Sequence, residues 1–189
     1  TVQLKKSGKK VTAERFLIAT GGHPSHEADS IEGSQHCITS NEAFYLDKLP
    51  RRVVIAGGGY IGVEFAHIFH GLGSDVTMLF RAPKILRGFD EDIRDCLTAE
   101  MHTNQIRCIP ERIIKRVDKK GDELFVFTDK NEMIEADCVM LAIGRHPNTH
   151  HLGLEKAGIE KGKHESVKVD EYSRTNLDHV YAIGDVTDR

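Results

Sequence analysis

Three glycines at fixed spacing constrain the fold of this chain more than any other feature of its sequence. Gly57, Gly59 and Gly62 form the pattern GxGxxG, and they follow a short apolar run at residues 53–56. An apolar run of this length is typical of a buried strand in a parallel sheet. From Ile61 onward, apolar residues recur at helical spacing, which predicts a helix directly after the glycine turn.

Each glycine of such a pattern has its own physical task. The first allows the tight turn after the strand, the second lets the backbone approach a pyrophosphate, and the third permits close packing of helix against strand. Phosphates would lie at the helix N-terminus, where unpaired N–H groups and the helix dipole favour negative charge. A second strand is predicted at residues 76–80, which completes a βαβ unit. The context favours dinucleotide binding over a purely structural glycine turn.

The end of the second strand indicates which dinucleotide would bind. An acidic residue there binds the ribose 2′-hydroxyl of NAD, whereas arginine accommodates the 2′-phosphate of NADP. This chain has Phe80 and then Arg81, and Lys84 and Arg87 follow in the loop. Two guanidinium groups can hold one phosphate through paired charge-assisted hydrogen bonds, which predicts NADPH as the cofactor. The alternative is a solvated basic loop without a ligand.

Composition and charge argue against several classes of function. The 189 residues include 26 basic and 29 acidic side chains, for a net charge of −3, so bulk electrostatics favour neither nucleic acid nor an anionic membrane as a partner. No apolar run approaches the roughly 18 residues that cross a bilayer, and the first residues do not resemble a signal peptide. A cytoplasmic protein is expected.

The cysteines and histidines show no metal-ligating pattern. The four cysteines are Cys37, Cys96, Cys108 and Cys138. They form no CxxC pair, and each is expected to be a buried or half-buried thiol. Among eleven histidines, His67 and His70 share the predicted helix, but a surface position is favoured for them over a metal site. No metal is predicted.

Shorter patterns predict the elements around the βαβ unit. Alternation and turn residues predict strands at 2–4, 11–13 and 16–19 before it, and an antiparallel meander of strands at 112–117, 123–128 and 132–135 after it. Further strands are predicted at 106–109, 137–143, 167–170 and 180–183, and further helices at 41–46, 90–101 and 154–158. Residues 23–50 are otherwise predicted to form a connecting segment.

Five motifs in order give the chain a resemblance to a known family. The stretches ATGGHPS, GGGYIGVE, the arginine pair after LF, AIGRHPNT and YAIGDVTDR resemble the FAD-dependent pyridine nucleotide-disulfide oxidoreductases, and most closely the glutathione-disulfide reductases among them. The resemblance implies an α/β fold: a Rossmann-like, three-layer FAD/NAD(P)-binding domain with a parallel sheet and an antiparallel β-meander. It implies an NADPH-binding domain at residues 23–147, with residues 1–22 and 148–189 belonging to the FAD-binding and central domains.

The resemblance also implies cofactor-binding residues. On the NADPH side they are Gly57, Gly59, Tyr60, Ile61, Gly62, Glu64, Arg81, Arg87, Gly144 and Arg145. On the FAD side they are Thr20, Gly21, Gly184 and Asp185. Tyr60 would cover the nicotinamide pocket at the flavin, Glu64 would lie beside the nicotinamide, and Asp185 would approach the ribitol chain.

Two departures from the family pattern bear on activity. Glutathione reductases often carry alanine where this chain has Gly62, and glycine there is common in the NAD-using dihydrolipoamide dehydrogenases, which in turn carry glutamate at position 80. The family's N-terminal FAD fingerprint, its cysteine pair separated by four residues and its C-terminal dimerisation domain with a His-Glu base do not occur in this sequence. No catalytic residue is therefore assigned, and the chain is interpreted as an internal segment, inactive alone, of a longer homodimeric enzyme.

That enzyme would pass hydride from NADPH to FAD, and then electrons to a redox disulfide and to oxidised glutathione. Three alternatives remain open. The parent enzyme could be a dihydrolipoamide dehydrogenase, or another reductase of the family such as trypanothione or mercuric reductase. The chain could also be a stand-alone nucleotide-binding module without turnover.

Overall fold

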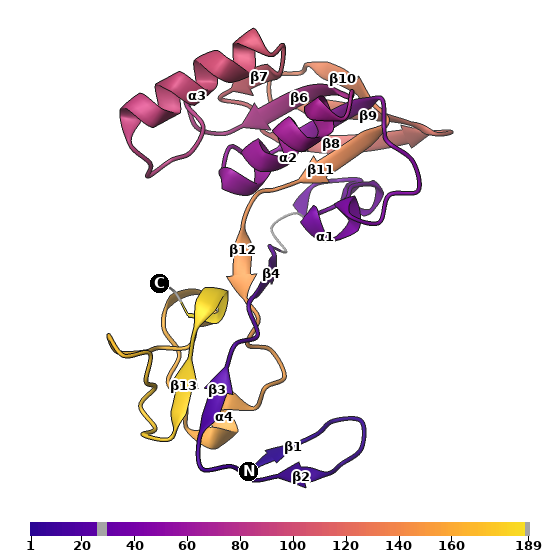
Figure 1. Ribbon diagram of the computed structural model, residues 1–189. Coiled ribbons are helices and arrows are strands. Elements are labelled where there is room, and N and C mark those ends of the chain that lie inside the picture. Colours follow the sequence, from indigo (N-terminus) through magenta and orange to yellow (C-terminus); the bar gives the residue numbers. More distant parts are fainter. Residues whose placement is uncertain (26–29, 188–189) are drawn as a thin grey trace. The chain divides into compact units, whose positions relative to one another are not determined.

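A four-stranded parallel sheet with the order β11-β5-β6-β7 forms the centre of residues 24–144 (Figure 1). Its strands and their connecting helices are β5 (Arg52–Ala56), α2 (Tyr60–Gly71), β6 (Asp75–Phe80), α3 (Glu91–Thr103), β7 (Arg107–Pro110) and β11 (Cys138–Leu141). Residues 30–51 add a short 3-10 helix, η2 (Ser34–His36), and one short α-helix, α1 (Ser40–Ala43). The βαβ unit and the parallel strand at 106–109 predicted from the sequence are confirmed.

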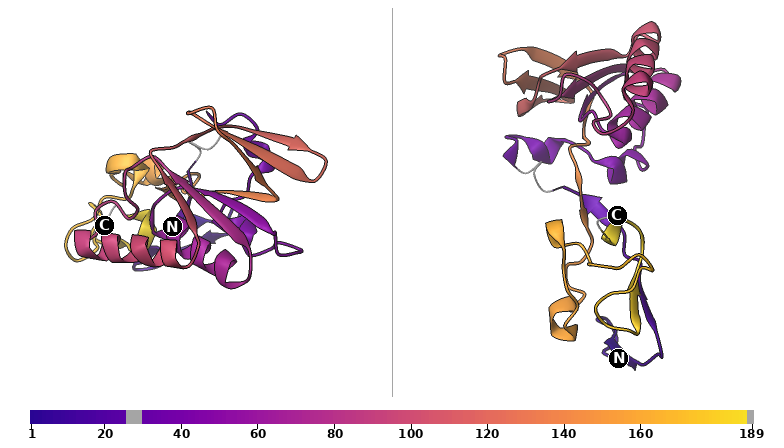
Figure 2. Two further views of the ribbon diagram at one scale, coloured as in Figure 1. Left: turned by 90° about the horizontal axis from the view of Figure 1, so that it is seen from above. Right: turned by 90° about the vertical axis from the view of Figure 1, so that its left-hand side faces the viewer.

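An antiparallel meander and two helices cover opposite faces of this sheet (Figures 1 and 2). The meander consists of β8 (Ile114–Lys120), β9 (Glu123–Thr128) and β10 (Met133–Ala136). Because successive side chains of a strand point to opposite faces, Val53 of β5 joins the apolar cluster under the helices, whereas Val54 joins the cluster under the meander. The predicted three-layer α/β fold is therefore confirmed.

Capping side chains fix the starts of two of the helices. Asp90 accepts hydrogen bonds from the backbone N–H groups of Asp92 and Ile93, at 3.0 and 3.4 Å, and so begins α3. Thr39 and Glu42 form a capping box at the start of α1. The helix predicted at 41–46 ends at Ala43, however, because the four residues of α1 bury no side chain that could anchor a further turn.

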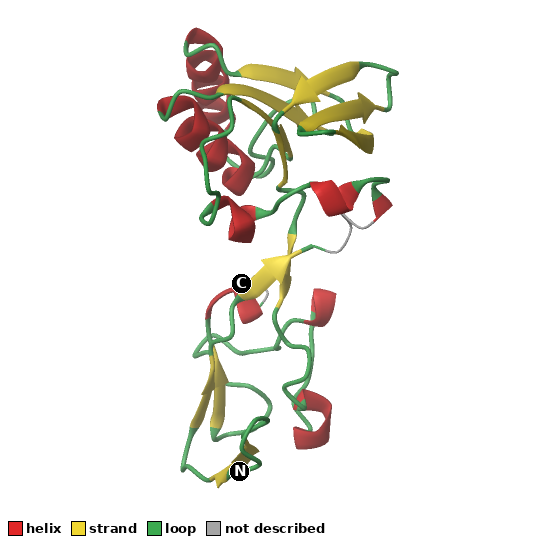
Figure 3. Ribbon diagram, turned by 90° about the vertical axis from the view of Figure 1, so that its right-hand side faces the viewer, coloured by secondary structure: helices red, strands yellow, loops and turns green. Residues whose placement is uncertain are grey.

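The other unit, residues 1–23 and 145–189, contains only short elements and much loop (Figure 3). They are β1 (Val2–Gln3), β2 (Lys10–Val11), β3 (Phe16–Ile18), β12 (Arg145–Pro147), α4 (Leu154–Ala157), η3 (Lys163–Glu165), β13 (Val180–Ala182) and η4 (Gly184–Val186), and β4 (Gly22–Pro24) begins here. β1 pairs with β2, β13 pairs in parallel with β3, and β12 pairs with β4. The core of this unit consists of Leu154, Ile159, Val167, Val180, Ala182 and Val186.

One strand prediction in this unit is wrong. Residues 167–170 form no strand, and only an isolated bridge joins Lys161 to Val167. The physical reason lies at Asp170, whose carboxylate accepts hydrogen bonds from the N–H groups of Tyr172 and Arg174, at 2.9 and 2.8 Å. This side chain turns the backbone where the strand would have continued.

The structure describes residues 1–25 and 30–187. Residues 26–29, which belong to the predicted connecting segment and include His26, lie outside that range, as do the last two residues of the YAIGDVTDR motif. The larger unit begins at Pro24 and ends at Gly144, compared with 23 and 147 for the predicted NADPH-binding domain. The division into two units does not show which cofactor each unit binds. The assignment of NADPH to the larger unit and of FAD to the smaller one therefore stays a prediction. In the described ranges, no helix is long and apolar enough to cross a bilayer.

Candidate functional site: a glycine turn and an arginine loop

Gly57 occupies a position that only glycine fits. Its φ angle is 128°, in the region that L side chains avoid, and a Cβ atom there would lie 2.1 Å from the carbonyl oxygen of Ala142. Its N–H donates to the carbonyl of Leu79 at 2.8 Å, which ties the turn to β6. The predicted task of the first glycine, to allow a tight turn after β5, is confirmed.

The other two glycines differ sharply in their surroundings. A Cβ atom on Gly62 would lie 2.2 Å from the carbonyl oxygen of Gly57, so α2 packs directly on the turn. A Cβ atom on Gly59 would meet nothing within 4 Å, and no side chain caps the helix that begins there. The helix therefore begins at an open position without a capping side chain, which fits a pyrophosphate.

Tyr60 and Glu64 lie one turn apart on α2, and both are exposed. Tyr60 is the first residue of the helix and 51% of its surface is accessible, so it is not a core aromatic. Ile61 is half-buried and packs against the apolar cluster under the helices. The roles of Tyr60 and Glu64 toward a nicotinamide stay predictions.

Phe80 places a phenyl ring beside the glycine turn, at the end of β6. It is buried, and a Cβ atom on Gly58 would lie 3.0 Å from the Cβ atom of Phe80. The end of the second strand is thus adjacent to the turn, as ribose recognition requires, but it offers no carboxylate to a ribose 2′-hydroxyl.

Residues 81–87 follow as a loop that is anchored at residues 85 and 86. Ile85 and Leu86 are buried, and the N–H of Leu86 donates to the carbonyl oxygen of Gly58 at 2.6 Å. Arg81 and Arg87, on either side of this anchor, are exposed. Within residues 1–25 and 30–187, neither guanidinium group has a hydrogen bond or an ion pair, so both are available to a ligand.

Lys84, which lies between the two arginines in the sequence, is already engaged. Its ammonium group lies 2.5 Å from Asp95 and 3.1 Å from Glu91, both on α3. These hydrogen bonds, with that to Asp95 the larger, raise the pKa of Lys84. Lys84 therefore holds the loop to α3 and leaves the ligand to the arginines.

Gly144 and Arg145, predicted together on the NADPH side, have different partners. The carbonyl oxygen of Gly144 accepts a hydrogen bond from the N–H of Ser25 at 2.9 Å. Arg145 donates to the carbonyl oxygen of Gly22 at 2.5 Å, and its Nε lies 3.7 Å from a carboxylate oxygen of Asp185. Arg145 is thus joined to Asp185, a residue assigned to the FAD side.

Asn148, which was not among the predicted site residues, binds two of the FAD-side residues, Thr20 and Gly21, within the smaller unit. Thr20 donates to the carbonyl oxygen of Asn148 at 2.8 Å, and the N–H of Asn148 donates to the carbonyl oxygen of Gly21 at the same distance. Asp185 follows Gly184, whose φ is 76°, and the side chain of Asp185 remains 62% exposed. The local sequence, Pro147 followed by Asn148, predicts a turn but does not indicate which residues Asn148 contacts.

The four cysteines are free thiols that differ in exposure. Burial raises the pKa of Cys37 to about 12 and that of Cys138 to about 11, so both are protonated at neutral pH. Burial also raises the pKa of half-buried Cys108. Cys96 corrects the prediction, because it lies on the solvent side of α3 and is exposed. In the described residues, no group of three or more histidine, cysteine or carboxylate side chains could hold a metal ion.

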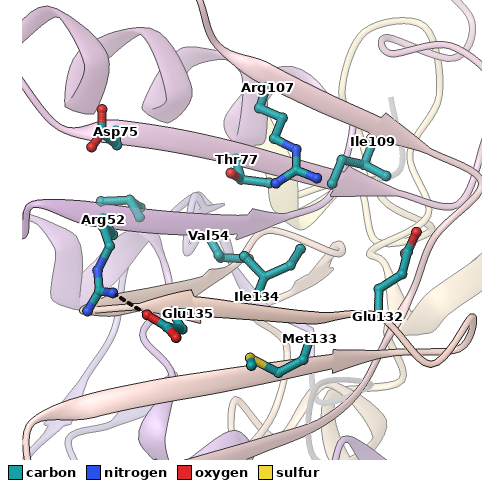
Figure 4. A pocket seen from close by; sticks show the side chains of 11 residues that line it. Arg52, Val54, Asp75, Thr77, Arg107, Ile109, Glu132, Met133, Ile134 and Glu135 are labelled. Atoms are coloured by element: carbon teal, nitrogen blue, oxygen red, sulfur yellow. Dashed lines mark hydrogen bonds and ion pairs between the residues drawn. The ribbon is translucent and has the colours of Figure 1, made fainter.

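A cavity of about 460 Å³ is lined mainly by residues of β5, β6, β7 and β10 (Figure 4). Arg52, Asp75 and Arg107, which line it, are the first residues of β5, β6 and β7, whereas the turn follows the last residue of β5. Arg52 pairs there with Glu135 at 2.9 Å. Ile109 also lines the cavity, and it is level with Leu79 and so with the last residue of β5, so the cavity extends along the face of the sheet that the meander covers.

Comparison with known proteins identifies the family. Residues 1–189 match the model of a family described as pyridine nucleotide-disulphide oxidoreductase. The chain belongs to this family. The resemblance inferred from the five motifs is thereby confirmed, and membership implies oxidoreductase chemistry with FAD and a pyridine nucleotide.

Two relatives and one solved structure illustrate the similarity. A glutathione reductase of Nostoc sp. is 41% identical over 96% of this chain and 42% of its own length. A trypanothione reductase of Leishmania donovani is 46% identical over 93% of this chain and 36% of its own length. The flavoprotein disulfide reductase RclA of Escherichia coli superposes with a TM-score of 0.84 at 31% identity, over 94% of this chain and 41% of its own. The chain thus spans about two fifths of the length of these proteins.

Proposed function

We propose that the chain binds NADPH between the glycine turn and the 81–87 loop, as the nucleotide-binding portion of a glutathione-disulfide reductase. The observation that carries this proposal is the pair Arg81 and Arg87. Both guanidinium groups are without partners in the described residues, and the loop that bears them is hydrogen-bonded to Gly58 of the turn. The pyrophosphate would lie over Gly59, where the backbone is open.

Charge explains why NADPH is favoured over NADH. The 2′-phosphate carries close to two negative charges near neutral pH, and each guanidinium offers it a planar pair of donors. Phe80 contributes no carboxylate that would repel the phosphate or bind the 2′-hydroxyl of NAD. One charge-assisted hydrogen bond contributes about 1.5 to 3 kcal/mol, so each arginine is expected to strengthen NADPH binding by about ten- to a hundredfold.

The remaining residues have proposed roles toward the reacting ends of the cofactors. NADPH supplies a hydride in this family, and Tyr60 and Glu64, exposed at the start of α2, would border its nicotinamide. Thr20, Gly21, Gly184 and Asp185 would line the FAD side. Gly144 and Arg145 would form a second loop toward NADPH, with Arg145 oriented by its contact to Asp185.

Oxidised glutathione is the proposed substrate of the whole enzyme, in line with the relative from Nostoc sp.. The relative from Leishmania donovani, at 46% identity, favours trypanothione disulfide as the second candidate. The ratio of kcat/KM for the two disulfides, measured on the full-length protein, decides between them.

We propose that this enzyme is a cytoplasmic homodimer, and that the 189-residue chain alone does not reduce disulfides.

Calorimetric titration with NADPH and with NADH tests the proposal. We expect the wild-type chain to bind NADPH more tightly, and Arg81→Ala and Arg87→Ala each to weaken NADPH binding while NADH binding barely changes. The preference should shrink as salt rises, because the guanidinium groups are exposed. Equal affinity for both cofactors in the wild type, or variants that lose both equally, would contradict the phosphate clamp.

A further inference from the structure

The arginine loop is held in place by α3, and one side chain makes the most buried of these contacts. Arg94, in the first turns of α3, donates from Nε to the carbonyl oxygen of Ile85 at 2.8 Å. Only 12% of the Arg94 side chain is exposed, and its Nη1 also forms a short ion pair with Glu91. Arg94 therefore contacts the backbone of the loop between Arg81 and Arg87 without contacting either arginine.

The carbonyl group that Arg94 binds is next to the anchor of the loop on the glycine turn. Leu86, the following residue, donates its N–H to Gly58, and its φ of 53° lies in the left-handed region. A leucine adopts this strained conformation only where its surroundings hold it. Arg94 on one side of the Ile85–Leu86 peptide and Gly58 on the other supply that restraint.

We propose that Arg94 is a positioning residue that sets the preference for NADPH over NADH, by fixing the loop that presents Arg81 and Arg87. The inference rests on the proposed function, because it requires that the two arginines bind a 2′-phosphate. Arg94 itself does not touch the cofactor. Glu91 connects Arg94 with Lys84, so the first two turns of α3 restrain the loop at two adjacent residues, 84 and 85.

Loss of this restraint has a selective consequence. An unrestrained loop would have to order its two guanidinium groups at each binding event, and that entropy cost would weaken the contact with the 2′-phosphate. NADH has no phosphate there and uses the glycine turn alone. A mutation of Arg94 should therefore reduce the ratio of the two affinities, whereas general destabilisation of the domain would reduce both.

The test is calorimetric titration of the 189-residue chain with NADPH and NADH, for the wild type, Arg94→Ala, Arg94→Lys and the control Arg116→Ala. Arg116 is an arginine of the meander that pairs with Asp118 and packs over Phe127, away from the 81–87 loop. We expect Arg94→Ala to weaken NADPH binding about tenfold, as for one lost charge-assisted hydrogen bond, and NADH binding less than twofold. Arg94→Lys should be intermediate, because lysine can reach the Ile85 carbonyl but cannot hold the fork to Glu91 as well. Arg116→Ala should equal the wild type.

Each outcome distinguishes the two proposals. A wild type that prefers NADPH, with an Arg94→Ala variant that keeps the same ratio or loses both cofactors equally, overturns the positioning role and leaves the phosphate clamp standing. A wild type without preference overturns both. If Arg94→Ala does not fold, Arg94→Lys and Lys84→Met, which removes the neighbouring restraint, must still lower the ratio, and an unchanged ratio in both overturns the inference.

Discussion

The two units of the chain differ in how their candidate cofactor residues are assembled. In the larger unit, the glycine turn, Tyr60 and the arginine loop lie within one stretch of about thirty residues, on a sheet covered on both faces. In the smaller unit, the FAD-side residues come from two separate segments, 20–21 and 184–185, which follow one pair of short parallel strands. Local contacts are enough to order a contiguous site on a sheet that is covered on both faces. The geometry of a dispersed site depends instead on the tertiary contacts that fix each of its segments.

The largest expected effect concerns the reactivity of the cysteine thiols. All four cysteines lie in the larger unit, so their labelling reports on how tightly that unit is packed. At pH 8 a thiol of pKa about 11, as for Cys138, is ionised in only about one thousandth of molecules, and burial blocks the reagent as well. We expect Cys96 to react rapidly in the native chain, while Cys37 and Cys138 react only when the larger unit unfolds. Mass spectrometry after a labelling pulse at increasing denaturant measures this. Rapid labelling of Cys138 in the native chain would show that β11 is not buried as the structure has it.

A pair of glycine variants separates stability from binding in the glycine turn. Gly57→Ala places a side chain at positive φ against the Ala142 carbonyl and should destabilise the larger unit by about 2 to 6 kcal/mol. Gly59→Ala meets no atom within 4 Å and loses only the N-cap preference for glycine, so stability should fall by at most about 1 kcal/mol while dinucleotide affinity falls. Denaturant unfolding and calorimetric titration of both variants check this. Equal stability losses would mean that the turn is packed differently.

Matched core substitutions test whether the units unfold separately. Val126 in the larger unit and Val167 in the smaller one are both fully buried. Each valine-to-alanine change should cost about 2 kcal/mol. We expect two calorimetric transitions, with Val126→Ala lowering only that of the larger unit and Val167→Ala only the other. A single transition, lowered equally by both variants, would show that the two units unfold as one.

The sequence predicted most where the pattern was local. GxGxxG between two apolar runs was sufficient for the βαβ unit, and the steric needs of Gly57 and Gly62 followed from it. Periodicity also located the meander, because its strands alternate and their turns are short.

Contacts between distant residues could not be predicted in this way. Nothing in the local sequence indicates that Lys84 pairs with α3, that Leu86 binds Gly58, or that Arg145 contacts Asp185. The wrong strand at 167–170 has the same origin, since an apolar alternation competed there with a side-chain turn at Asp170.

The most direct test of the account is calorimetric melting of the chain with and without cofactor. A ligand at a hundredfold excess over its Kd stabilises the unit that binds it by about 2.7 kcal/mol. At equal concentrations, NADPH should raise the transition of the larger unit, NADH should raise it less, and the transition of the smaller unit, which contributes only Arg145, should move least. Replacing both Arg81 and Arg87 by alanine should remove the advantage of NADPH. Equal shifts with NADH and NADPH, or a shift of the smaller unit alone, would contradict an NADPH site built on the glycine turn and the arginine loop.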